Sequence, residues 1–310
     1  MEVILAQHAG FCFGVKRAVE ILDGELAGGA GKRIYTWGPI IHNEAVVESY
    51  AARGVRAVDS LDELDRLLSE TGEDADPGVL VIRSHGVSKA VFEGLEKRGL
   101  TVVDATCPFV KRIHRAVQEA AEQGRTVIVT GDPAHPEVEG IVGWAAYAPV
   151  YVVSTPEEAE KLALPVGTPV TVVSQTTFRV TKFQEIVEII QEKEYDVNIV
   201  GTICNATEER QKEAQELSGR MDAMIVVGGA HSSNTRKLFE ICSRICPQTS
   251  FIHTPEDLSG LSWPDEVRRV GITAGASTPQ KIIEEVVNYV RSGQEFHGNG
   301  GRVVQDDPHG

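Results

Sequence analysis

Three cysteines stand at almost equal intervals along the chain, because Cys12, Cys107 and Cys204 are separated by 95 and 97 residues. Each one follows an apolar, strand-like run, such as TVVDAT before Cys107, and precedes a helical pattern. A glycine turn that ends in histidine comes after each cysteine, with the sequences GPIIH, GDPAH and GGAH. The spacing therefore predicts one α/β module used three times.

Apolar periodicity predicts four strands in each module, alternating with helices. The strands are expected at 3–8, 33–37, near Val55 and at 79–84; then at 101–105, 126–130, 149–153 and 170–174; then at 198–203, 223–227, 249–253 and 268–273. This alternation favours right-handed crossovers and parallel sheets. We expect an α/β fold of three modules related by pseudo-threefold symmetry, in a trefoil arrangement around a central site. Ligands in such folds bind beyond the carboxyl ends of the strands.

The module boundaries follow from the same pattern. We expect modules at 1–100, 101–196 and 197–291, each of a size that suits a compact domain. The tail at 292–310 is expected to be irregular, because Gly, Asp and His replace the periodic apolar residues there.

Charge and hydropathy exclude several classes of partner. The formal net charge of −15 and the lack of a basic stripe argue against a nucleic-acid partner. No run of about 18 apolar residues and no secretory signal pattern is found, so we expect a cytoplasmic protein with no membrane partner. In a reducing compartment the five cysteines are expected to be thiols, metal ligands or catalytic groups rather than disulfides.

The three spaced cysteines favour a metal centre. A buried structural role is usual for an isolated cysteine. Three thiolates gathered at equivalent strand ends would repel one another unless a cation neutralised them. Zinc usually takes a fourth ligand and C-x-x-C spacing, which this sequence lacks. An iron–sulfur cluster accepts thiolates from distant segments, and three protein ligands leave one iron open.

The other two cysteines lack counterparts in the repeat. Cys242 and Cys246 lie four residues apart on the helical stretch SNTRKLFEICSRI. We interpret them as packing residues of a helix face, with an auxiliary redox role as the less favoured alternative.

Polar loops follow several strands and indicate an anion site. His42, His85 and His135 each stand after a predicted strand, where imidazole N–H groups and helix N-termini can face a phosphate. Capping or core packing is the ordinary role of any one such histidine. Short polar side chains in the third module add further hydrogen-bonding groups, at Ser232, Ser233, Asn234 and Ser277. Together these residues resemble a cradle for phosphate or diphosphate.

A carboxylate stands beside one of these histidines. Glu137 follows His135 and Pro136 in AHPEVEG, at a predicted helix start. That position normally favours the ionised form, so its use as a proton donor needs a nearby anion or reduced cluster. Glu139 in the same segment is a second candidate.

Nine ordered motifs identify a resemblance at this point: HAGFCFGVKRAV, GPIIHN, IRSHGV, DATCPFV, HPEVEG, SQTT, TICNAT, GGAHSSNT and TAGASTP. Together they resemble the 4-hydroxy-3-methylbut-2-enyl diphosphate reductase family, the iron–sulfur enzymes of the last step of the non-mevalonate isoprenoid pathway. The resemblance extends to about residue 290.

The resemblance implies a 4Fe-4S cluster on Cys12, Cys107 and Cys204, with one open iron for the substrate hydroxyl. It implies that Glu137 is catalytic and that Thr176 lies at the hydroxyl and proton-relay position. The diphosphate would be held by His42, His85, His135, Ser232, Ser233, Asn234 and Ser277. An allylic diphosphate would be reduced to isopentenyl and dimethylallyl diphosphates, with electrons from an external one-electron donor of ferredoxin or flavodoxin type.

Two other classes of function stay open. A non-redox iron–sulfur dehydratase would turn over without an electron donor. An iron–sulfur electron carrier or redox sensor would be expected to have a fourth cysteine ligand and no anion pocket. A change in the cluster spectrum on binding a diphosphate would separate the enzyme from the carrier.

Overall fold

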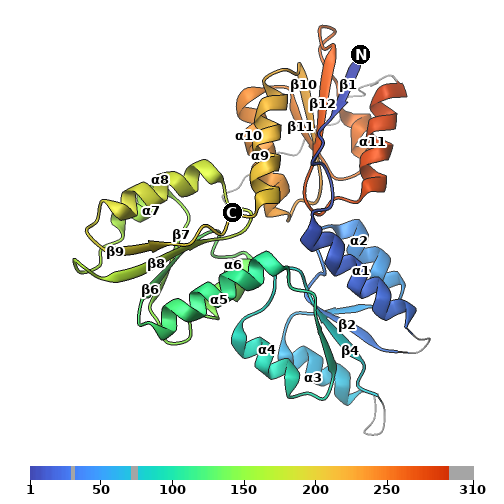
Figure 1. Cartoon of the computed structure of the whole chain (residues 1–310). Helices are drawn as coiled ribbons and strands as arrows, with labels where there is room; N and C mark the ends of the chain where they lie inside the picture. The colour runs from blue at the N-terminus through green and yellow to red at the C-terminus, as the bar shows by residue number, and fades with distance from the viewer. Residues whose placement is uncertain (29–31, 71–75, 293–310) are drawn as a thin grey trace. The chain divides into compact units, whose positions relative to one another are not determined.

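The computed structural model describes residues 1–28, 32–70 and 76–292. Their strands form three four-stranded sheets, and all strand pairs within each sheet are parallel (Figure 1). The parallel α/β fold and the four strands in each sheet are therefore as the sequence predicts. Of the predicted irregular tail at 292–310, only Ser292 is described, and it ends a helix; the remainder lies outside the described residues.

The first sheet has the strand order β3-β2-β4-β5. Its central strand β4 carries the uninterrupted apolar sequence VLVI, with all four residues buried, as expected for a strand covered on both faces. Helices cover the two faces and enclose two apolar clusters. The elements are β2 (Ile34–Trp37), β3 (Arg56–Val58), β4 (Val79–Ile82), β5 (Thr101–Asp104), α1 (Phe13–Ala27), α2 (Glu44–Ala52), α3 (Leu61–Ser69) and α4 (Lys89–Glu96).

The second sheet has the order β7-β6-β8-β9 and repeats the same design. Its central strands β6 and β8 supply valines and isoleucines to apolar clusters on both faces. The elements are β6 (Thr126–Thr130), β7 (Val150–Val153), β8 (Pro169–Ser174), β9 (Asp196–Ile199), α5 (Pro108–Glu122), α6 (Pro136–Val142), α7 (Pro156–Lys161) and α8 (Val180–Gln191).

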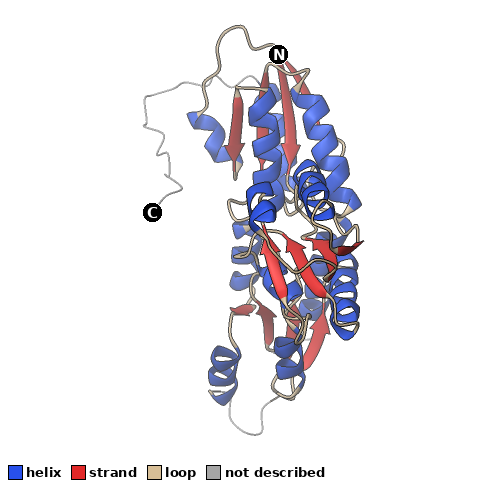
Figure 2. Ribbon diagram, turned by 90° about the vertical axis from the view of Figure 1, so that its left-hand side faces the viewer, coloured by secondary structure: helices blue, strands red, loops and turns tan. Residues whose placement is uncertain are grey.

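The third sheet has the order β1-β12-β10-β11. Helices α9 and α10 cover one face and α11 covers the other, and Figure 2 shows helices beside the strands in a second view. The elements are β1 (Glu2–Leu5), β10 (Ala223–Val227), β11 (Thr249–Ile252), β12 (Arg269–Ala274), α9 (Asn205–Ser218), α10 (Ser233–Ile245), the 3-10 helix η1 (Pro255–Gly260) and α11 (Gln280–Ser292).

The sheets are offset by one strand from the sequence modules. The first predicted strand of each module pairs with the sheet of a neighbouring module: β1 pairs with β12, β5 with β4 and β9 with β8. Periodicity predicts that a strand exists, but its partner is chosen by backbone hydrogen bonds to distant residues. The chain also divides into two compact units, Phe11–Glu209 with the first two sheets, and Met1–Gly10 with the chain from Arg210 onward. The boundaries at 100/101 and 196/197 stay predictions.

Two helices begin directly after a cysteine that does not cap them. Ser, Thr or Asn caps several helices through a side-chain oxygen, as Ser60 does for α3 and Thr155 for α7. Cys12 and Cys107 hold the same position before α1 and α5, and neither thiol caps its helix. Neither sulfur therefore takes the part that Ser60 and Thr155 take as helix caps. Separately, none of the helices in the described ranges has the length and apolar character needed to cross a bilayer.

Candidate active site

The three spaced cysteines all lie in the unit Phe11–Glu209, each directly before a helix. The backbone ties two of them to other predicted site segments. The Cys107 amide donates a hydrogen bond to the Ser84 carbonyl at 2.9 Å, and the Cys204 amide donates to the Thr176 carbonyl at 3.1 Å. All three are half-buried thiols. The second sheet thus holds Cys204 through the loop that follows β8.

The thiols influence one another electrostatically. The pKa of Cys107 is raised to about 11, first by burial and then by the charges of Cys12 and Cys204, against the backbone amides that lower it. The pKa of Cys204 is also raised, first by burial and then by Cys12 and Glu137. Without a cation, Cys107 and Cys204 therefore favour the protonated thiol.

Gly14 brings α1 against the Cys107 sulfur. A Cβ at position 14 would lie 2.5 Å from Cys107 Sγ and 3.0 Å from its Cβ. No side chain fits there, so the GFCFG segment requires glycine two residues after Cys12. The start of α1 consequently packs directly against the thiol of Cys107.

This donor set fits an iron–sulfur cluster. Three soft sulfur donors from separate loops are half-buried together, and their mutual repulsion as thiolates would be relieved by bound iron. The other two cysteines have a different environment. Cys242 and Cys246 are buried in the apolar cluster of the third sheet with Leu238 and Met224. Packing, the interpretation favoured from the sequence, is their observed role.

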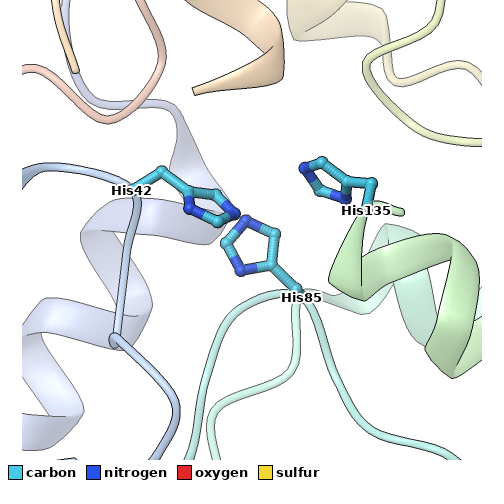
Figure 3. Close-up of side chains that lie close together, drawn as sticks. All are labelled: His42, His85 and His135. Carbon is cyan, nitrogen blue, oxygen red and sulfur yellow. The ribbon is translucent and has the colours of Figure 1, made fainter. Parts of the chain in front are cut away.

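Three histidines converge in the same unit. Figure 3 shows His42, His85 and His135 entering from separate loops and pointing toward one another. Their ring centroids are 4.3, 5.3 and 5.5 Å apart. Burial lowers the pKa of His85 well below its usual value, and the neighbouring His42, His135 and Arg83 lower it further. His85 is therefore a neutral imidazole.

An imidazole triad of this spacing could in principle hold a metal ion, since one ring nitrogen of each histidine lies within 4.8 Å of the others. A helix cap argues against that. Nδ1 of His135 accepts a hydrogen bond from the Glu137 amide at 3.1 Å. In the neutral ring, Nε2 then carries the proton, so neither nitrogen of His135 is available to a metal. The triad is better suited to donating hydrogen bonds to an anion.

Glu137 is the most deeply buried carboxyl group near these histidines, with 2 % of its surface exposed. Thr176 donates two hydrogen bonds to it, from its amide to Oε1 at 2.6 Å and from its hydroxyl to Oε2 at 2.8 Å. Burial raises the pKa of Glu137 to about 7, against these two hydrogen bonds, which lower it. Near neutral pH this carboxyl group can therefore hold or release a proton. Glu139 is exposed.

The remaining predicted residues gather in the other unit, between the start of α10 and the end of β12. Ser232, Ser233, Asn234 and Ser277 are all buried. The Asn234 carbonyl oxygen accepts from the Ala276 amide at 3.0 Å, and the Ser277 and Ser232 hydroxyls are 3.4 Å apart. Within the described residues, the Asn234 Nδ2 donor has no hydrogen-bond partner. A helix start with an unsatisfied buried donor suits an anion.

One residue that supports the site was missed from the sequence. Gln175 accepts from the Asp132 amide at 3.1 Å and donates to the Thr177 hydroxyl at 3.1 Å. It therefore holds the loop that carries His135 beside the loop that carries Thr176. Its place in the SQTT motif was the available signal, but the hydrogen-bond partners of its side chain are not visible in a sequence.

With this geometry established, similarity to known proteins identifies the relatives of the chain. The family model described as LytB protein matches residues 3–291. A protein of Caldanaerobacter subterraneus subsp. tengcongensis is 43% identical over 94% of this chain and 97% of its own length. A protein of Geobacter sulfurreducens is 43% identical over 96% and 98%, respectively. Both are named 4-hydroxy-3-methylbut-2-enyl diphosphate reductase.

Two solved structures are also similar. One is titled as (E)-4-hydroxy-3-methyl-but-2-enyl diphosphate reductase, the terminal enzyme of the non-mevalonate pathway; it is 39% identical, with a TM-score of 0.64, over 94% of this chain and all of that chain. The reductase from Plasmodium falciparum is 27% identical, with a TM-score of 0.83, over 98% of this chain and 94% of that chain.

Proposed function

Because this chain belongs to the LytB family, we propose that it reduces (E)-4-hydroxy-3-methylbut-2-enyl diphosphate, as its named relatives do. The reaction consumes one allylic alcohol, two electrons and two protons. It breaks the C–O bond, releases water and gives isopentenyl or dimethylallyl diphosphate. The protein is thus an oxidoreductase of the non-mevalonate isoprenoid pathway.

The cofactor that we propose is a 4Fe-4S cluster held by Cys12, Cys107 and Cys204. The electrostatic effect of neighbouring thiols on the pKa of Cys107 and Cys204 supports a single binding site for the cluster. The close packing of Gly14 against Cys107 supports it as well. When bound, a cluster with three protein ligands supplies electrons and leaves one iron available as a Lewis acid.

We propose that the histidine triad binds the diphosphate. The neutral ring of His135 presents an Nε2–H donor because its Nδ1 caps α6, and His85 is kept neutral by burial. Neutral donors bind the anion without a full positive charge inside the site. Ser232, Ser233, Asn234 and Ser277 are proposed as further diphosphate contacts, and their burial at the start of α10 supports this role. The trefoil arrangement that would bring all of them to one centre stays a prediction.

Glu137 is the proposed proton donor, with Thr176 as its relay partner. The Thr176 hydroxyl donates to Glu137 Oε2, which fixes the carboxyl group and keeps the threonine oxygen beside it. A carboxyl group with a pKa of about 7 is matched to proton transfer near neutral pH. The single observation that carries the proposal is this buried, raised-pKa acid, whose hydrogen-bonding partner Thr176 also holds the amide of Cys204.

The experiment supplies anaerobically reconstituted protein with the hydroxy diphosphate and reduced methyl viologen. We expect formation of both isoprenoid diphosphates, and one molecule of substrate consumed for each two viologen radicals oxidised. Consumption of the substrate without any reductant would instead indicate a non-redox dehydratase. Failure of the diphosphate to bind would indicate an electron carrier.

The physiological donor is proposed to be a ferredoxin or flavodoxin, because a 4Fe-4S cluster would accept electrons one at a time. Cytoplasmic location likewise stays a prediction from the sequence.

A further inference from the structure

The start of α5 is unusually basic for this chain. The first eight residues of α5, Pro108 to Arg115, include Lys111, Arg112 and Arg115 and no carboxylate, whereas the whole chain has 45 acidic and 30 basic residues. Arg112 and Arg115 are exposed, and within the described part of the chain neither forms an ion pair. Arg112 and Arg115 therefore do not balance neighbouring acids, and they lie on the helix that Cys107 immediately precedes.

Hydrogen bonds extend this basic surface to α1. The Arg17 guanidinium donates to the Thr106 carbonyl at 3.3 Å and to the Asp104 carbonyl at 3.5 Å. Lys111 Nζ lies 2.6 Å from Asp104 Oδ2, so Arg17 and Lys111 both contact Asp104. Residues four apart share a helix face, which places Phe13 beside Arg17 and Arg115 beside Lys111. The result is a continuous strip, Phe13–Arg17–Lys111–Arg115, across the starts of both helices.

Apolar surface accompanies the strip. The Phe13 side chain directly follows Cys12 and is 64% exposed, an uncommon state for a large apolar residue. A hollow of about 370 Å³ opens beside Lys111 and Arg115, and its apolar lining includes Phe92, Pro108 and Trp144. Pro108 directly follows Cys107. A partner seated on this surface would therefore lie next to two of the three proposed cluster ligands.

We propose that the strip Phe13–Arg17–Lys111–Arg115, with Arg112 and the adjoining hollow, is the docking surface of an acidic one-electron carrier protein. This inference rests on the proposed function, because only a reductive reaction needs such a partner. Apolar contact with a charged rim is the usual anatomy of a protein interface, and opposite charge accelerates encounter. Each docked donor would supply one electron, so two donor molecules would be oxidised for each substrate reduced.

Charge reversal tests the proposal. We compare Arg112→Glu/Arg115→Glu with the control Arg56→Glu/Arg66→Glu, which changes two exposed arginines of β3 and α3 and shifts the net charge equally. Turnover is measured with an acidic ferredoxin at low ionic strength and, separately, with reduced methyl viologen, a small reductant that needs no protein interface. Iron content is measured in every sample.

We expect kcat/KM for the ferredoxin to fall about 10-fold or more in Arg112→Glu/Arg115→Glu, and to lose most of its dependence on salt. Turnover with methyl viologen should equal that of the unmodified protein, and the control variant should be normal with both donors. If charge reversal lowers iron content, the neutral variant Arg112→Gln/Arg115→Gln replaces it, with a smaller loss expected. An unchanged kcat/KM for ferredoxin would overturn the docking surface alone. Absence of methyl viologen turnover in the unmodified protein would overturn the proposed function itself.

Discussion

Two regions of this molecule use cysteine in opposite ways. In the unit Phe11–Glu209, Cys12, Cys107 and Cys204 stand before helices as half-buried thiols that influence one another. In the third sheet, Cys242 and Cys246 are buried in an apolar cluster. The pKa of both Cys107 and Cys242 is raised to about 11, chiefly by burial. A raised thiol pKa therefore does not distinguish a proposed ligand from a packing residue, and neither does a neighbouring thiol, because Cys246 raises the pKa of Cys242. The position of the cysteine at a strand-to-helix loop is the feature that differs.

The largest expected effect comes from removing a proposed ligand. Cys107→Ser should lower the iron bound to the protein severely and reduce turnover at least about 100-fold, because a hydroxyl is a poor ligand for iron–sulfur clusters. Iron content is measured by chemical analysis and turnover by viologen oxidation. Normal iron and normal turnover in this variant would remove Cys107 from the site.

A similar contrast separates the two carboxylates of α6. Glu137→Gln keeps the shape of the buried side chain but removes its proton, so turnover should fall about 100-fold, within the usual range for a general acid. Iron content and diphosphate binding should stay near normal. Glu139→Gln is the matched control, because Glu139 is exposed on the same helix. Equal turnover in the two variants would reduce Glu137 to a residue of the helix start.

The pH profile should report the same carboxyl group. Burial raises the pKa of Glu137 to about 7, above its ordinary value, so the folded protein favours the protonated carboxyl group. The stability that this preference contributes to the fold is lost as pH rises through 7. Above that pH, turnover should fall about 10-fold for each further pH unit, as the acid form is depleted. The remaining activity of Glu137→Gln should lack this limb. A limb that persists unchanged in that variant would assign it to another group.

A smaller loss is expected at Gly14, which packs against the sulfur of the proposed ligand Cys107. Gly14→Ala places a Cβ against Cys107 Sγ, which must shift to accommodate it. Cluster iron should fall partially, whereas Gly24→Ala on the same helix, where a Cβ meets nothing within 4 Å, should be normal. Anaerobic iron analysis of the two variants makes the comparison. Equal iron content would mean that the Cys107 thiol can move freely.

The smallest effect is expected at the buried Cys242 and concerns stability alone. Cys242→Ser puts a hydroxyl into an apolar cluster, so the free energy of unfolding should fall by about 1 to 3 kcal/mol. Iron content and turnover should not change. Urea unfolding gives the stability, and loss of iron in this variant would indicate that Cys242 has a role beyond packing.

Much of the fold was predictable because its signals are local. The run VLVI is apolar throughout, and TVIVT has an apolar centre between two β-branched threonines; the structure places these strands at Val79–Ile82 and Thr126–Thr130. The pairing of β1 with β12 was not predictable from periodicity, because more than 260 residues separate Glu2 from its partner Arg269. The division of the chain into two compact units depends on the same long-range contacts.

The residue types of the site were predictable from the sequence, but their burial, hydrogen bonds and protonation were less so. Repetition and motif resemblance pointed to Glu137 and His135, but not to the hydrogen bond by which His135 caps α6 and fixes its tautomer. The choice between Glu137 and Glu139 needed burial, which depends on how α6 packs. Gln175 lies within the SQTT motif, yet its contact with the Asp132 amide joins loops 43 residues apart and is not visible in the sequence.

Iron and acid-labile sulfide analysis of the anaerobically purified protein tests the central claim most directly. We predict about four iron and four sulfide per chain, as expected for one cubane cluster, with both lost in Cys107→Ser and both retained in Cys242→Ser. A protein that catalyses the reduction without iron, or that holds equal iron in those two variants, would contradict the assignment of the three spaced cysteines.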